Sequence, residues 1–129
     1  MPLRCLIVDD NASFRGEIRG LLQEQGIEVM GDAASTAEAL QQVAQQRPDV
    51  VLIDIDLGGE SGLELARTLR DGAGHDALPH LILISTHDEG EYADLIEASP
   101  ALGFLAKTEL SAPAIRRMLA AHRAGGERG

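Results

Sequence analysis

The sequence predicts an α/β fold in which one parallel sheet is covered by helices on both faces. Short apolar runs alternate along the chain with segments whose apolar residues recur at helical spacing, as in proteins built on parallel sheets. The runs are almost continuously apolar, which indicates strands that are buried on both faces. The five expected strands occupy residues 3–8, 29–33, 50–53, 81–84 and 103–106.

Capping patterns predict where the helices between these strands begin. A side-chain oxygen three residues before a glutamate satisfies free N–H groups at a helix N-terminus. A serine followed by a proline marks the last helix, since proline is tolerated in a first turn. The expected starts are Ser35 with Glu38, Ser61 with Glu64, Asp88 with Glu91, and Ser111 with Pro113.

Length and charge limit the classes of function. The 129 residues suit a single domain, which we place at residues 1–124, and the glycine-rich residues 125–129 are expected to form a disordered tail. The net charge of −10 opposes direct contact with nucleic acid. No signal peptide or membrane-spanning run is evident, and the one cysteine, Cys5, is expected to be a small buried hydrophobe in the first strand. These features favour a cytoplasmic protein with no membrane contact.

Polar side chains stand where the apolar runs end. Asp9 and Asp10 follow the first run, Asp54 the third, Ser85 the fourth and Lys107 the fifth. In open α/β sheets ligands bind in the crevice outside the carboxyl ends of the strands. We therefore expect these side chains to converge on one site.

The chemistry of these residues predicts phosphoryl transfer. Carboxylates about 4 Å apart repel by roughly 4 kcal/mol at an effective dielectric near 20, so the cluster needs a cation. Oxygen ligands without histidine or thiolate favour Mg²⁺, which often bridges carboxylates to phosphate. Asp54 can then act as a nucleophile, while Lys107 supplies positive charge and Ser85 a hydroxyl donor.

The same residues resemble the receiver domain of two-component response regulators over essentially the whole chain. The features are the pair Asp9-Asp10, Asp54 in Val-Val-Leu-Ile-Asp-Ile-Asp-Leu, Gly62 eight residues later, Ser85 ending Leu-Ile-Leu-Ile-Ser, and Lys107 in Gly-Phe-Leu-Ala-Lys. The resemblance implies a flavodoxin-like (βα)5 fold with strand order 2-1-3-4-5. Residues 26–34 and 38–40 are similar to the branch whose receivers precede helix-turn-helix output domains, although no such domain is expected in this chain.

The resemblance also implies a role for each site residue. Asp54 would accept the phosphoryl group, and Lys107 would pair with it. Ser85 would be the switch hydroxyl, and Phe104 falls at the position of the rotating aromatic residue. The Mg²⁺ ligands would be Asp9 or Asp10, Asp54, and the backbone carbonyl of Asp56.

The implied function is mainly that of a signalling switch with self-catalysed phosphoryl transfer and autodephosphorylation. A histidine kinase or a phosphotransfer protein would phosphorylate it. Its output would be changed binding to a downstream protein or to an output domain on another chain. The surface formed by the fourth helix, fifth strand and fifth helix would change, and it is a candidate homodimer interface.

Three positions depart from the family pattern. Gly58 stands where proline is usual and is expected to loosen the loop beside the site and weaken metal binding. Thr86 replaces a small residue and is expected to crowd the phosphoryl pocket, while Thr108 replaces a commonly cis proline and leaves the geometry of Lys107 open. The residues expected to act on a hydrolytic water are Asp56, Thr86 and His87.

Two other classes of function remain open. The string around Asp54 and Asp56 also resembles the first motif of haloacid-dehalogenase-type phosphatases. That motif would lie on the third strand here instead of the first, and it leaves the earlier acidic pair unexplained. The other class is a receiver-like adaptor that is never phosphorylated, which the three departures favour. Reaction with acetyl phosphate and Mg²⁺ separates the three.

Overall fold

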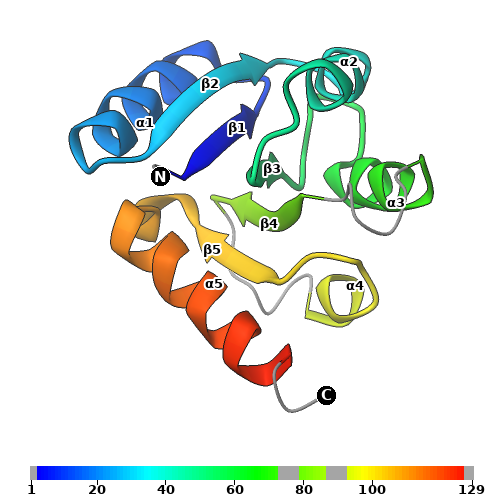
Figure 1. The fold of residues 1–129 in the computed structure, drawn as a ribbon. Helices are drawn as coiled ribbons and strands as arrows, with labels where there is room; N and C mark the ends of the chain where they lie inside the picture. The colour runs from blue at the N-terminus through cyan, green and yellow to red at the C-terminus, as the bar shows by residue number, and fades with distance from the viewer. Residues whose placement is uncertain (1–2, 73–78, 87–92, 127–129) are drawn as a thin grey trace.

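The computed structural model describes residues 3–72, 79–86 and 93–126, in which strands and helices alternate as predicted (Figure 1). Every strand begins and ends within one residue of the bounds expected from the sequence. In chain order the elements are β1 (Arg4–Val8), α1 (Ala12–Glu24), β2 (Glu28–Ala33), α2 (Thr36–Gln46), β3 (Val50–Asp54), α3 (Gly62–Gly72), β4 (His80–Ser85), α4 (Ala93–Glu97), β5 (Gly103–Ala106), a 3-10 helix η2 (Lys107–Glu109) and α5 (Ala112–Gly126).

The strands form one parallel sheet in the order β2-β1-β3-β4-β5, which confirms the predicted order. From β1 the chain passes to β2, which lies at one edge of the sheet. It then crosses to β3, on the other side of β1, and adds β4 and β5 toward the opposite edge. The direction in which strands are added therefore reverses between β1 and β3. A reversal of this kind opens a crevice at the carboxyl ends of the two strands. Pairing of Val8 with Ile53 sets those two ends side by side.

Apolar side chains form two layers, one on each face of the sheet. Helices α1 and α5 cover one face, and α2, α3 and α4 cover the other (Figure 1). Along β3, Val51 and Ile53 join the layer under α2, α3 and α4, whereas Val50 and Leu52 join the opposite layer. Because close packing holds β3 on both faces, the strand delivers Asp54 to a defined position.

Serine side chains cap three helices as predicted. In each case the hydroxyl oxygen accepts a hydrogen bond from the backbone N–H three residues later, at 3.2 to 3.3 Å. The pairs are Ser35 with Glu38 at α2, Ser61 with Glu64 at α3, and Ser111 with Ala114 at α5. The remaining predicted start, Asp88 with Glu91, lies outside the described residues.

The end of α5 differs from the prediction. The helix continues through Gly125 and Gly126, which the sequence placed in the disordered tail. Glycine disfavours helix through backbone entropy but keeps the N–H that continues the helical hydrogen bonds, so composition alone set the boundary too early. The rest of the tail, residues 127–129, lies outside the described part of the chain.

The environment of Cys5 matches the expectation of a buried hydrophobe. The residue is fully buried in β1, and burial raises the pKa of its thiol to about 12. The thiol is therefore neutral and unreactive at physiological pH. Among the described helices, none combines the length and apolar character needed to cross a membrane.

Candidate functional site

The residues predicted for the site meet at the carboxyl ends of four strands. Asp9 directly follows β1, Asp54 ends β3, Ser85 ends β4, and Lys107 directly follows β5. Pairing of Ser85 with Ala106 sets the serine beside the residue that precedes the lysine. The parallel sheet therefore gathers side chains that lie far apart in the sequence.

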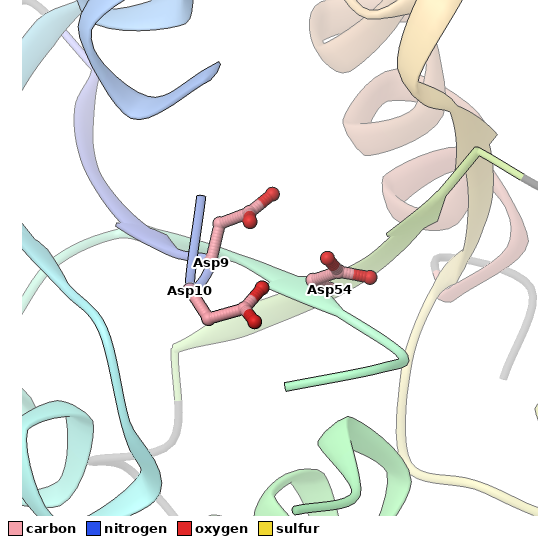
Figure 2. A group of neighbouring side chains, drawn as sticks. All are labelled: Asp9, Asp10 and Asp54. Atoms are coloured by element: carbon pink, nitrogen blue, oxygen red, sulfur yellow. The ribbon is translucent and has the colours of Figure 1, made fainter. Parts of the chain in front are cut away.

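Three carboxylates, those of Asp9, Asp10 and Asp54, point into the same space at this edge (Figure 2). One oxygen from each lies within 4.8 Å of the others. Asp9 is fully buried and Asp54 is 6% exposed, whereas Asp10 is exposed. Asp9 Oδ1 accepts a hydrogen bond from Asn11 N (2.8 Å), and Asp54 Oδ1 accepts one from Asp56 N (3.1 Å). Both members of the acidic pair contribute to the cluster, a choice that the sequence had left open.

Lys107 offsets part of the negative charge in the buried part of the cluster. Its Nζ lies 2.5 Å from Asp9 Oδ2 and 3.0 Å from Asp54 Oδ2. Burial alone would lower the pKa of Lys107, but the hydrogen bonds to the two carboxylates outweigh it and raise that pKa above its ordinary value. Burial also raises the pKa of Asp54, against the opposing effects of Lys107 and Asp56 N–H. Thr108, which stands where the family commonly has a proline, lies in η2. Lys107 reaches both carboxylates with this threonine after it.

The donor set fits Mg²⁺. Hard carboxylate oxygens are the ligands that this ion prefers, and the potential metal-binding group found among the described residues contains no histidine or thiolate. Three carboxylates and one ammonium together carry a formal charge of −2, which a divalent cation would balance. Asp9, Asp10 and Asp54 could therefore hold the ion. The backbone carbonyl of Asp56 as a further ligand stays a prediction.

A two-residue hairpin shapes the loop between β3 and α3. Leu57 N donates to Glu60 O (3.0 Å), and Glu60 N donates to Leu57 O (3.4 Å). Gly58 and Gly59 between them have φ of +62° and +101°, as a type I′ turn requires. Proline could not replace Gly58 here because its ring holds φ near −65°. The sequence led us to expect a loosened loop, but the structure shows a hydrogen-bonded turn.

Gly62 is required by the close approach of α3 to the site. A Cβ atom at this position would lie only 2.0 Å from the backbone oxygen of Asp54. Gly62 N also donates a hydrogen bond to Ile55 O (2.8 Å), which holds the start of α3 against the end of β3. Glycine at this position lets the helix begin directly behind the candidate phosphoacceptor.

The predicted switch residues lie on the two strands at one edge of the sheet. Ser85 is 2% exposed at the end of β4, and Phe104 in β5 packs, partly buried, against the apolar layer under α2, α3 and α4. Thr86 is exposed, so crowding of the pocket by this residue stays a prediction. His87 lies outside the described residues.

Two residues of α1 contact the site and were missed in the sequence. The Phe14 ring centroid lies 4.4 Å from Lys107 Nζ. Arg15 Nη1 donates a hydrogen bond to the backbone oxygen of Asp9, and Arg15 Nε lies 3.6 Å from Asp32 Oδ2. Both residues occupy the early turns of the helix that follows the acidic pair, and this position was the only signal that could have found them.

Comparison with known proteins matches residues 5–120 to the family model of the response regulator receiver domain. An uncharacterized response regulatory protein of Vibrio cholerae is 34% identical over 125 residues, which cover 94% of this chain and 50% of that protein. The DNA-binding transcriptional activator EvgA of Escherichia coli is 29% identical over 107 residues, covering 83% of this chain and 51% of EvgA. The chain thus spans about half the length of these curated relatives.

Solved structures show the same fold. The signal receiver domain of NarL from Mycobacterium tuberculosis has a TM-score of 0.77 and 28% identity, covering 91% of this chain and 96% of that one. A LuxR-family response regulator from Aurantimonas has a TM-score of 0.76 and 28% identity, with coverages of 97% and 87%. These neighbours fit the branch that the sequence resembles. Neither the phosphatase nor the adaptor alternative is favoured by the comparisons.

Proposed function

The chain belongs to the receiver domains of response regulators, and on that premise we propose that Asp54 accepts a phosphoryl group in a Mg²⁺-dependent reaction. The observation that carries the proposal is the meeting of three carboxylates with a largely buried lysine at the carboxyl ends of the strands, beside the crevice between β1 and β3. A histidine kinase or a phosphotransfer protein would supply the phosphoryl group.

The proposed reaction is a displacement at phosphorus. An oxygen of Asp54 forms a bond to phosphorus while the bond from phosphorus to the donor histidine nitrogen breaks, and that nitrogen keeps the electron pair. Mg²⁺, when bound, would neutralise charge on the phosphoryl oxygens. Lys107 is already 3.0 Å from Asp54 Oδ2, close enough to pair with a phosphoryl oxygen, and the Ser85 hydroxyl would donate to another.

Acetyl phosphate tests this function directly. With Mg²⁺ present we expect stable labelling of the wild-type protein at one residue, no labelling of Asp54→Asn, and slower labelling with weaker Mg²⁺ binding in Asp10→Asn. Asp71→Asn is the matched control, since Asp71 is exposed and pairs with Arg70. Label retained at the wild-type rate on Asp54→Asn would defeat the proposal. Continuous hydrolysis of phosphate esters would favour the phosphatase, and no reaction the adaptor.

The output of the switch would be a change at the surface of α4, β5 and α5. A phosphoryl group on Asp54 would draw the Ser85 hydroxyl toward it, and Phe104 would rotate into the space that the serine leaves. The changed surface would bind a downstream protein, an output domain on another chain or a second copy of this chain, without direct contact to nucleic acid. Identical Phe104 rotamers in beryllium fluoride-activated and untreated structures would count against this switch.

Thr86 would influence how long the phosphorylated state survives. The residue follows Ser85 and is exposed, at the rim from which water would approach the phosphoryl group. We expect Thr86→Ala to shorten the lifetime of the phosphoprotein several-fold, because in-line attack by water is sensitive to position. Release of phosphate with excess Mg²⁺ measures this lifetime, and Asp56 and His87 are further candidates to orient that water.

Family membership also supports a cytoplasmic location.

A further inference from the structure

We propose that Phe14 is a positioning residue for Lys107, and that its ring holds the lysine ammonium in the site during phosphoryl transfer. The inference rests on the proposed function of Asp54. The ring centroid is 4.4 Å from Lys107 Nζ, well within the range in which an aromatic face attracts a cation. The lysine side chain is only 11% exposed, so solvent weakens this attraction less than at an open surface.

The ring gives the lysine a third contact in addition to those with the two carboxylates. In the structure Lys107 Nζ also contacts Asp9 Oδ2 and Asp54 Oδ2. Both carboxylates belong to the candidate metal site, and Asp54 would change chemically when it is phosphorylated. An aromatic ring is not a ligand for Mg²⁺, which binds oxygen. Phe14 can therefore hold the ammonium in place while its two anionic partners are engaged elsewhere.

The position of Phe14 is itself tied to the acidic site. Asp9 Oδ1 accepts a hydrogen bond from Asn11 N (2.8 Å), and Asn11 Oδ1 in turn accepts one from Phe14 N (3.1 Å) as the cap of α1. The ring of Phe14 contacts the ammonium of Lys107, and that ammonium forms an ion pair with Asp9. The backbone of Phe14 is thus linked to Asp9 through Asn11, and its ring contacts the lysine that pairs with the same aspartate.

A single lysine makes the contact observable. Lys107 is the only lysine among the 129 residues, so protein labelled with ¹³C at the lysine ε-carbon gives one signal. A neighbouring ring shifts the resonance of that methylene group. We expect this shift to disappear in Phe14→Leu, which keeps apolar volume without a ring, and to remain in Phe14→Tyr. The measurement requires no phosphodonor and therefore does not depend on the proposed reaction.

The kinetic test uses the same variants with acetyl phosphate. We expect Phe14→Leu to lower the maximal rate of labelling about three- to tenfold, in keeping with the strength of a partly desolvated cation–π contact. The Mg²⁺ concentration for half-maximal labelling should change little, and Phe14→Tyr should restore the rate. Leu21→Ala is the control for general weakening of α1, since Leu21 packs in the same apolar layer and should label at the wild-type rate.

The outcomes separate this inference from the function on which it rests. A lysine signal that is unchanged in Phe14→Leu, a wild-type rate in that variant, or a Phe14→Tyr rate as low as that of Phe14→Leu would each overturn the positioning role. If the wild-type protein takes no label, the proposed function fails. The NMR shift alone then decides whether Phe14 holds the lysine.

Discussion

The inner and outer halves of the acidic site are built in different ways. The inner half consists of Asp9, Asp54 and Lys107, which are nearly or fully buried and already paired with one another. The outer half consists of Asp10, which is exposed, and Gly58, where an added Cβ would lie against the Asp10 carboxylate. Strand packing and an ion pair hold the inner half, whereas a tight turn shapes the outer half.

Because of this difference, we expect substitutions in the inner half to change mainly folding stability and substitutions in the outer half to change mainly metal affinity. Buried charges are costly unless they are paired, so changes to the inner half should act strongly on folding. An exposed carboxylate is solvated in any state, so changes around Asp10 should act mainly on the metal that it would bind. The following variants test that division, beginning with the largest expected effect.

Replacing Lys107 with methionine should destabilise the protein most. The change leaves Asp9 and Asp54 as neighbouring buried carboxylates without a counter-charge. Breaking a buried ion pair costs about 3 to 5 kcal/mol, and we expect a loss in this range at neutral pH. Mg²⁺ should restore part of it by binding the folded state. Urea unfolding with and without Mg²⁺ measures both effects.

Arg70→Met is the matched control for the lost positive charge. Arg70 pairs with Asp71 at the surface, and both side chains are largely exposed, so the change should alter stability by less than about 0.5 kcal/mol. Equal losses of stability in Lys107→Met and Arg70→Met would show that burial of the Lys107 ion pairs does not increase their contribution to stability.

Gly62→Ala should cost about 2 to 3 kcal/mol, because overpacking at a close backbone contact forces the chain to move. The added Cβ would lie 2.0 Å from Asp54 O, so α3 or the end of β3 must shift, and labelling of Asp54 should slow. Gly16→Ala is the control. A Cβ at this position meets nothing within 4 Å, and the substitution removes a glycine from the interior of α1. That control should gain about 0.5 to 1 kcal/mol, and thermal unfolding compares the two.

Gly58→Ala tests the outer half. Alanine at positive φ costs about 1 to 2 kcal/mol, and its Cβ would lie 2.6 Å from Asp10 Oδ2. We expect the Asp10 carboxylate to be displaced and Mg²⁺ affinity, measured by calorimetry, to fall. Gly59→Ala has the same kind of strain at φ +101° but meets nothing within 4 Å, so it should keep the affinity of the wild type. Equal affinities in the two variants would show that strain alone, and not the contact with Asp10, matters.

The smallest effect concerns the pH dependence contributed by Asp54. Burial raises its pKa in the folded state above the ordinary 3.8, while Lys107 and Asp56 N–H offset part of the rise. The folded state therefore binds the Asp54 proton more tightly than the unfolded state does. The stability that this proton contributes to the folded state is present at low pH and is lost as pH rises through the folded pKa. Asp54→Asn should accordingly be more stable than wild type at neutral pH, with the difference shrinking in acid below the unfolded value. Urea midpoints that differ equally at all pH values would contradict this assignment.

Local sequence patterns were enough to predict the elements and the strand ends. Continuous apolar runs and serine caps act between near neighbours, so the strand bounds and the starts of three helices followed from them. The candidate site was predicted for the same reason, since Asp54, Ser85 and Lys107 each stand at the end of such a run. The order of the strands came from the resemblance to a family and not from these patterns.

Tertiary structure alone decided how the site is assembled. It made Asp9 the buried partner of Lys107 and left Asp10 exposed, although the two are adjacent in the sequence. It also turned Gly58 into part of a hydrogen-bonded hairpin and brought Phe14 over the lysine. These features depend on distances between segments that are separated along the chain, and packing fixes such distances only after the sheet and its helices have come together.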